Sequence, residues 1–226
     1  MVLRATETSS VTGRPALDQL CRAYWYPLYA YVRRKGHAPE EAQDLTQAFF
    51  ARLLEKRYLV HANRERGKFR TFLLTSLQRF LVNEWEKLRA EKRGGGAVLV
   101  AWDEQEAGSR YLAEKAEAHT PEKLFERRWA LALLEQVLAR LAEEFGAAGK
   151  QQQFEQIKVL LWGDKAAPPY AEVAARMSLS EGALKVVVHR MRHRYRELLR
   201  AEVARTIVSP GEVDEELRHL IAVISS

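Results

Sequence analysis

The stretch "YAEVAARMSLSEGALKVVVHRMRHRYREL", residues 170–198, decides the fold of this chain. It holds two apolar patterns of helical spacing, separated by a short turn around Ser178. Ala174 is small where the two helices would cross closely, and Ser180 is a suitable N-cap for the second helix. The spacing predicts a helix-turn-helix, although an ordinary helical hairpin could show the same apolar pattern. Such turns usually have glycine at the position of Ser178 to reach positive φ, so we expect some strain there.

The second of these helices carries a large excess of positive charge. Its apolar stripe consists of Leu184, Val187, Met191, Tyr195 and Leu198. The other faces carry Lys185, His189, Arg190, Arg192, Arg194, Arg196 and Arg200. Glu197 is the only acid between Lys185 and Arg200, so the cations lack partners at helical spacing. Unpaired cations along one helix suit phosphates, and a basic solvated helix is the alternative.

The whole chain has the composition of a basic, water-soluble protein. It has 226 residues, 47% of them hydrophobic, a net charge of +6 and a pI near 9.5. A basic balance favours a nucleic acid or an acidic membrane surface as partner, but no apolar run is long enough to insert into a membrane. The first residues lack the apolar core of a signal peptide, so we expect a cytoplasmic protein. Cys21 is the only cysteine, which excludes an internal disulfide and a cysteine-based zinc site.

Helical periodicity continues along most of the chain, so the predicted class is all-α with two helical domains. The first domain is predicted to contain helices over about 16–35, from Pro39 onward, and from Phe69 to about Lys92. The second of these should bury Ala42, Leu45, Phe49 and Leu53. The third has the apolar stripe Leu74, Leu77, Leu81, Trp85 and Leu88.

An acidic segment separates the two predicted domains. Residues 94–120 begin with three glycines and contain five acids against two bases. A new apolar stripe then runs through Leu124, Leu131, Leu134, Leu138, Leu141 and Phe145, followed by a shorter helix with Phe154, Ile157 and Leu161. The predicted boundaries are 1–93 for the first domain, 94–120 for the linker, 121–205 for the second domain and 206–226 for a C-terminal helical extension.

Three segments together resemble the extracytoplasmic-function (ECF) class of bacterial RNA polymerase sigma factors, in the sigma-70 family. They are "APEEAQDLTQAFFARLL" at 38–54, "RGKFRTFLLTSLQRFLVNEWEKLR" at 66–89, and the helix-turn-helix stretch at 170–198. The resemblance covers 16–92 as sigma region 2 and 121–205 as sigma region 4. It implies core RNA polymerase and promoter DNA as partners, and an anti-sigma factor is a further candidate. Phe80 and Glu84 replace a frequent asparagine and a frequent aspartate, which affects the expected base preference.

The resemblance also implies roles for residues of region 2. Asp44 and Gln47 would meet the polymerase clamp. The loop 58–68 and the start of the next helix would capture an unstacked base of the minus-ten element. The residues expected along the melted strand are Arg79, Asn83 and Lys87. The aromatic residues Tyr58, Phe69 and Phe72 would either stack on bases or belong to the core, and aromatics at such spacings more often belong to the core.

In region 4 the resemblance implies that the basic helix enters the major groove of the minus-thirty-five element. The residues placed to approach base edges or phosphates are Ala183, Lys185, Val186, His189 and Arg190. Further along the helix, Arg192, Arg194 and Arg196 would contact mainly phosphates. The acidic linker would run through the polymerase toward the RNA exit path, with a plain disordered linker as the alternative.

Two other classes of function compete with this interpretation. One is a helix-turn-helix transcription regulator that binds DNA but not core polymerase. The other is an enzyme, for which the sequence offers little: His189 and His193 are four residues apart, but no acid completes an HExxH pattern. Neither a glycine-rich phosphate loop nor a Ser/His/Asp set is recognised, so we expect no catalytic residue, cofactor or metal site.

The C-terminal extension is predicted to form a helix that begins at Ser209 and Pro210. Its first turns are acidic, and its apolar stripe is Val213, Leu217, Leu220, Ile221 and Ile224. So short a helix needs a surface to pack on, so we expect it to fold back on the other helices. There it would either shield a basic DNA-binding surface or only stabilise the fold.

Overall fold

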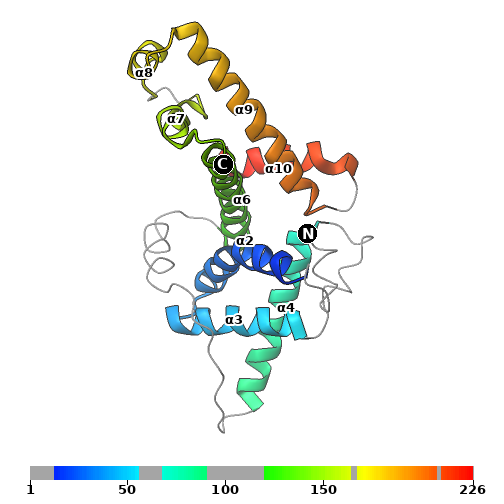
Figure 1. Cartoon of the computed structure of the whole chain (residues 1–226). Coiled ribbons are helices and arrows are strands. Elements are labelled where there is room, and N and C mark those ends of the chain that lie inside the picture. The colour runs from blue at the N-terminus through cyan, green and yellow to red at the C-terminus, as the bar shows by residue number, and fades with distance from the viewer. Residues whose placement is uncertain (1–12, 56–67, 91–119, 164–166, 208–209, 226) are drawn as a thin grey trace. The chain divides into compact units, whose positions relative to one another are not determined.

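The computed structural model describes residues 13–55, 68–90, 120–163, 167–207 and 210–225, and the regular elements in these ranges are all helices (Figure 1). The predicted all-α class is therefore confirmed. Most of the predicted base-capturing loop, including Tyr58, and nearly all of the acidic linker lie outside the described residues. Within the described ranges, no helix combines the length and apolar character that crossing a bilayer requires.

The chain divides into two compact units. The first consists of Met1–Ala132 together with Val203–Ser226, and the second consists of Leu133–Glu202. The long helices α6 (Pro121–Ala147) and α9 (Glu181–Ala204) therefore each contribute to both units. The start of the predicted second domain and the C-terminal extension belong to the same unit as the helices of the predicted first domain.

The first unit is built from α2 (Gly13–Arg34), α3 (Pro39–Glu55), α4 (Phe69–Ala90), the start of α6, the short 3-10 helix η3 (Pro210–Glu212) and α10 (Val213–Ser225). Helix α2 ends just before Gly36, whose φ of 102° is a conformation that other residues rarely adopt. Helix α3 begins at Pro39, with Glu40 and Glu41 favourably placed in its first turn. The predicted break between these two helices is confirmed.

Aromatic side chains from three helices form the centre of the first core. Trp129 of α6 is 2% exposed, and its indole N–H donates a hydrogen bond to the Tyr24 hydroxyl over 3.1 Å. The Tyr24 ring meets Phe69 edge-on, with ring centroids 5.5 Å apart. Phe69 is 5% exposed. It is therefore a core residue, which was one of the two predicted alternatives, and not an exposed ring available to stack on a base.

The buried face of α4 differs from the predicted stripe. Its fully buried apolar residues are Phe69, Leu73, Leu77 and Phe80, whereas Leu74 and Leu81 are half-buried and Trp85 is 55% exposed. Apolar residues lie on two adjacent faces of this helix, and the fold buries the face that contains Phe80. The Phe80 ring packs on Phe49, with centroids 5.7 Å apart, and under the Arg52 guanidinium at 5.8 Å. The prediction that Trp85 is buried was wrong.

The second unit surrounds its own core with the end of α6, α7 (Gln151–Ile157), the 3-10 helix η2 (Lys158–Leu160), α8 (Tyr170–Arg176) and most of α9. The core residues are Val137, Leu141, Phe154, Ile157, Leu160, Leu161, Val173, Ala174, Leu184, Val188, Met191, Tyr195 and Leu198. Phe154, Ile157 and Leu161 are all buried, as predicted for the shorter helix.

Helices α8 and α9 have the local geometry predicted for a helix-turn-helix. Ala174 is 3% exposed. Ser178 has a φ of 53°, so a serine does occupy the left-handed position where glycine is usual, at a cost of about 1 kcal/mol. The Leu179 N–H closes the turn on the Ala174 carbonyl at 2.9 Å. Ser180 accepts a hydrogen bond from the Ala183 N–H at 3.1 Å, which confirms the predicted N-cap.

Candidate nucleic-acid interface

The N-terminal half of α9 presents an exposed face after the Ser180 cap. The residues predicted to approach base edges are all exposed, namely Ala183, Lys185, Val186, His189 and Arg190. The apolar member of this set, Val186, is 51% exposed. An exposed apolar side chain between cations is suited to contact a thymine methyl group in a major groove.

The cations on this face differ in their partners. The Lys185 ammonium lies 2.6 Å from the Glu181 carboxylate one turn earlier, and this hydrogen bond raises the pKa of Lys185. Arg190 and Arg196 are exposed, and within the described part of the chain neither has an ion pair. These two arginines are therefore the cations of α9 that are most available to phosphates.

Arg192, also predicted to contact phosphates, has hydrogen-bond partners within the second unit. Its Nε donates to the carbonyl oxygens of Leu160 at 3.2 Å and Leu161 at 3.1 Å, and its Nη2 donates to Leu160 at 2.6 Å. These oxygens lie at the end of η2, where the helix has no further N–H groups to offer them. Arg192 therefore caps a helix end of the second unit.

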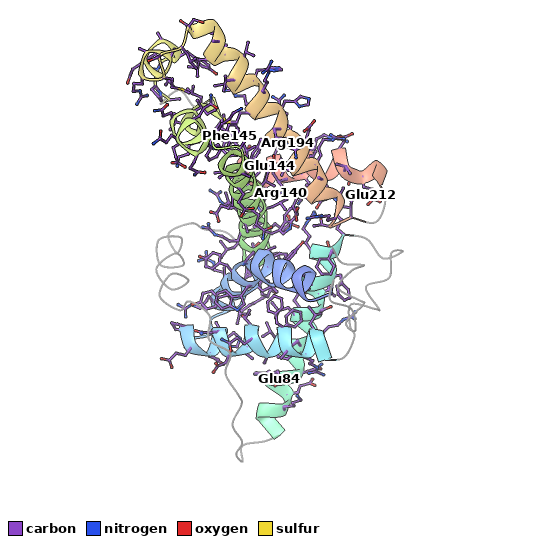
Figure 2. The ribbon with its side chains drawn as sticks, viewed as in Figure 1. Glu84, Arg140, Glu144, Phe145, Arg194 and Glu212 are labelled. Atoms are coloured by element: carbon purple, nitrogen blue, oxygen red, sulfur yellow. The ribbon has the colours of Figure 1, made fainter. Side chains whose placement is uncertain are left out.

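Arg194, the next residue predicted to contact phosphates, is held by carboxylates in this structure. Its guanidinium makes two parallel hydrogen bonds of 2.8 Å to Glu144 of α6 and a third of 2.8 Å to Glu197 (Figure 2). The hydrogen bond to Arg194 lowers the pKa of Glu144 below its usual range. Glu144 lies 50 positions earlier in the sequence, so helical spacing could not reveal this pair.

The predicted contacts of the first domain lie on two helices of the first unit. Asp44 on α3 is exposed, whereas Gln47 is half-buried and its amide nitrogen is enclosed. Arg79, Asn83 and Lys87 on α4 are all exposed. Glu84, labelled in Figure 2, accepts hydrogen bonds from Lys87 at 2.7 Å and from Arg52 at 3.4 Å, so it ties α4 to α3.

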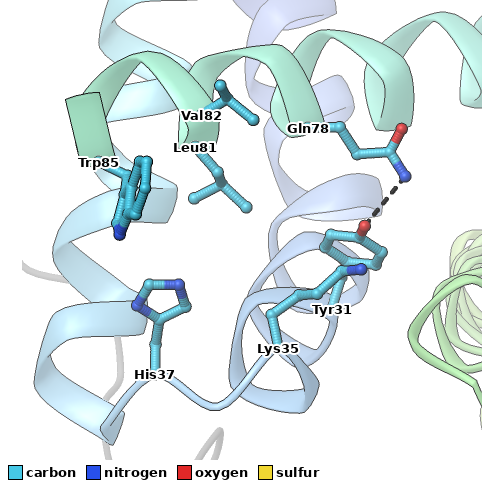
Figure 3. A pocket seen from close by; sticks show the side chains of 7 residues that line it. All are labelled: Tyr31, Lys35, His37, Gln78, Leu81, Val82 and Trp85. Carbon is cyan, nitrogen blue, oxygen red and sulfur yellow. Dashed lines mark hydrogen bonds between the residues drawn. The ribbon is translucent and has the colours of Figure 1, made fainter.

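A pocket that the sequence did not indicate opens beside α4 in the first unit (Figure 3). It has a volume of about 540 Å³ and is lined by Tyr31, Lys35, His37, Gln78, Leu81, Val82 and Trp85. The Gln78 amide donates to the Tyr31 hydroxyl at 3.0 Å. The Lys35 ammonium lies 5.3 Å from the Tyr31 ring centroid. Val82 and Trp85 are both more than half exposed, so this end of α4 combines apolar and polar groups at the surface.

A metal centre is not formed by the described residues. They contain no group of three His, Cys, Asp or Glu side chains close enough to share an ion. His193 instead has its Nδ1 3.3 Å from Glu197 on the same helix.

Comparison with known protein families gives an assignment for the first part of the chain. Residues 20–91 match the family model described as Sigma-70 region 2. This segment is therefore similar to sigma-70 region 2. The matched segment includes α3, α4 and most of α2, and so carries Asp44, Gln47, Arg79, Asn83 and Lys87. The match supports a sigma factor of the sigma-70 family, a group of transcription initiation factors that bind RNA polymerase and recognise promoters. No match was found among curated proteins or among solved structures.

Proposed function

We propose that this protein is an ECF-class sigma factor that binds core RNA polymerase and directs it to promoters. The observation that carries the proposal is the match of residues 20–91 to sigma-70 region 2. A second, separate helical unit with the local geometry of a helix-turn-helix agrees with it, since a sigma factor needs a second contact to DNA. In this proposal the protein works in the cytoplasm, and the polymerase carries out catalysis.

The proposed minus-ten contacts are the exposed residues Arg79, Asn83 and Lys87 of α4. The proposed minus-thirty-five surface consists of Ala183, Lys185, Val186, His189 and Arg190, with Arg196 on phosphates. Arg192 and Arg194 are left out, because carbonyl oxygens and carboxylates already hold their guanidinium groups. Fewer phosphate contacts imply a weaker salt dependence than the six lysine and arginine residues of the helix would suggest.

The second candidate function is a helix-turn-helix regulator that binds DNA without core polymerase. The helix-turn-helix geometry fits this candidate equally well, but the region 2 match does not, because a regulator has no need for it. A pull-down of purified core polymerase with the full chain separates the two: retention of polymerase supports the sigma factor, and DNA binding without retention supports the regulator.

The first prediction concerns the polymerase contact. Replacing Asp44 and Gln47 together by alanine should weaken binding to core polymerase by about tenfold, since an exposed polar contact contributes on the order of 1 kcal/mol. Polymerase affinity is measured by fluorescence anisotropy with the labelled full chain. Because Gln47 is half-buried, a thermal melt must show that the variant remains folded. Glu40→Ala, exposed on the same helix, is the matched control, and equal affinity of all three proteins would contradict the assignment of Asp44 and Gln47.

The second prediction separates base reading from phosphate contact on α9. Arg190→Ala or Lys185→Ala should cost about 1 to 3 kcal/mol on the preferred promoter and relax the preference at one base pair. Arg196→Ala should weaken binding to all sequences about equally, because phosphates carry no sequence information. Holoenzyme binding to a set of single-base promoter variants measures both effects. A changed base preference in Arg196→Ala, with none in the other two variants, would place the helix differently in the groove.

A further inference from the structure

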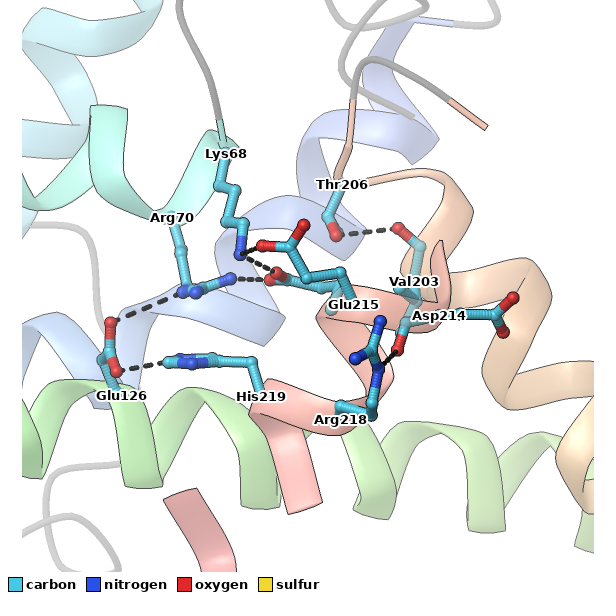
Figure 4. Close-up of polar contacts among 10 residues, drawn as sticks. Lys68, Arg70, Glu126, Val203, Thr206, Asp214, Glu215, Arg218 and His219 are labelled. Atoms are coloured by element: carbon cyan, nitrogen blue, oxygen red, sulfur yellow. Dashed lines mark hydrogen bonds and ion pairs between the residues drawn. The ribbon is translucent and has the colours of Figure 1, made fainter. Parts of the chain in front are cut away.

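The C-terminal helix α10 makes a cluster of ion pairs with the start of α4 in the first unit (Figure 4). The Lys68 ammonium lies 2.9 Å from Glu216 and 3.3 Å from Glu215. The Arg70 guanidinium pairs with Glu216 on one side and lies 3.6 Å from Glu126 of α6 on the other. Two acids of α10 therefore form ion pairs with both cations at the N-terminal end of α4.

The centre of this cluster is removed from water. The side chain of Glu216 is 1% exposed and that of Arg70 is 5% exposed, whereas Lys68 is 25% exposed. The Arg70 guanidinium also lies 4.7 Å from the Trp129 ring centroid. Burial lowers the pKa of Arg70, although the negative charge of Glu126 acts in the opposite direction. A buried carboxylate is stable only while its cations remain in place, so the docking of α10 depends on this cluster.

Further contacts, from α10 and from the residues before it, hold α10 in the first unit. His219 Nε2 lies 3.0 Å from Glu126 Oε2, and the Phe69 N–H donates to the Thr206 carbonyl at 3.3 Å. Val213 and Leu220 are buried, as predicted, but Ile221 of the predicted stripe is 62% exposed. Glu216 takes the buried position instead, because Lys68 and Arg70 offer it two positive charges. A charged residue on the buried face favours a specific partner over general apolar packing.

We propose that α10 is an intramolecular competitor of single-stranded promoter DNA for Lys68 and Arg70. This inference rests on the proposed function and on the expectation that the start of α4 meets the melted minus-ten strand. Carboxylates and phosphates use the same ammonium and guanidinium donors, so both cannot occupy Lys68 and Arg70 together. With α10 in place, the free protein withholds these two cations from DNA, and release of α10 makes both available to phosphates.

The test uses the full chain with charge-neutral substitutions in α10. Glu215→Gln alone, and Glu215→Gln combined with Glu216→Gln, should raise affinity for a fluorescein-labelled single-stranded oligonucleotide of about 12 nucleotides, without polymerase. We expect an increase of about threefold for the single variant and about tenfold for the double variant. The salt dependence should steepen by about 0.7 in log–log slope for each additional phosphate that the protein neutralises. Glu212→Gln, which removes the same charge from the preceding turn, should leave affinity unchanged.

A second substitution tests whether Lys68 is the cation that binds the oligonucleotide. In the background with both glutamines, Lys68→Ala should cancel most of the increase, whereas Lys35→Ala, elsewhere in the first unit, should not. Glu216→Gln can destabilise the fold, since it leaves the Arg70 charge poorly compensated, but Glu215 is 64% exposed, so the single variant remains informative. A lower melting temperature with unchanged DNA affinity in the single and double variants would overturn the inference and leave α10 as a stabilising helix.

The same proteins are tested for polymerase-dependent transcription from a promoter, so that two kinds of failure are distinguished. Normal transcription by the wild type, with no rise in single-strand affinity in the variants, overturns the role of α10 alone. Failure of every variant and of the wild type to bind core polymerase overturns the proposed function, and the role of α10 with it.

Discussion

Trp129→Ala is expected to lower the free energy of unfolding of the first unit by about 3 to 5 kcal/mol. The indole is 2% exposed, donates its N–H to Tyr24, and carries the Arg70 guanidinium on its face. The substitution removes a large buried side chain, one hydrogen bond and a cation–π contact at a single position. Hydrogen exchange measured by mass spectrometry should show faster exchange in α2 and α4, while α8 and α9 change less.

Two control substitutions show how much of the stability loss at Trp129 comes from the lost hydrogen bond and how much from the burial of the ring. Trp129→Phe keeps most of the ring but loses the N–H donor, so it should cost about 1 to 2 kcal/mol. Trp162→Ala removes a tryptophan that is 57% exposed, so it should cost about 1 kcal/mol or less. Equal losses for Trp129→Ala and Trp162→Ala would contradict the position of Trp129 in the core.

Leu184→Ala is expected to have the second-largest effect, a loss of about 2 to 5 kcal/mol confined to the second unit. Leu184 is fully buried in the core of the second unit, between α8 and α9, and alanine leaves a cavity there. Urea unfolding followed by circular dichroism measures the loss, and hydrogen exchange should locate it in α7, α8 and α9. Under the proposed function, polymerase binding through the first unit should survive this change, whereas binding to the minus-thirty-five element should be lost.

Val186→Ala is the matched control for Leu184→Ala. It lies two positions along the same helix and is 51% exposed, so its effect on stability should stay within about 0.5 kcal/mol. Its small effect on folding also makes any change in DNA affinity interpretable as a change at the surface. If Val186→Ala destabilised the second unit as strongly as Leu184→Ala, the assignment of the buried face of α9 would be wrong.

Features that depend on neighbouring residues could be predicted from the sequence. The end of α2 before Gly36, the start of α3 at Pro39 and the cap at Ser180 all follow from backbone chemistry within a few positions. The positive φ of Ser178 follows in the same way, because the turn geometry fixes it whatever the residue.

Features that depend on distant residues could not be predicted. Glu144 neutralises Arg194 across 50 positions, and the carbonyl oxygens of η2 hold Arg192 across about 30. The burial of Glu216 depends likewise on Lys68 and Arg70, nearly 150 positions earlier. For Arg192 and Arg194 helical spacing places the residue off the apolar stripe, but only the assembled unit decides whether the charge meets solvent or a hydrogen-bond partner. For Glu216 helical spacing also gives the wrong face, because the stripe predicted for α10 did not include it.

Helix α6 is 27 residues long, and its two halves belong to different cores. A fragment ending in the acidic segment before it would contain all of α2, α3 and α4 but would lack Phe125 and Trp129, which fill the first core. Such a fragment would expose an aromatic cavity and tend to aggregate, even though the family match lies entirely inside it. We therefore expect residues 13–90 of this chain, studied in isolation, to need the first half of α6 supplied in trans, as a peptide covering residues 120–132.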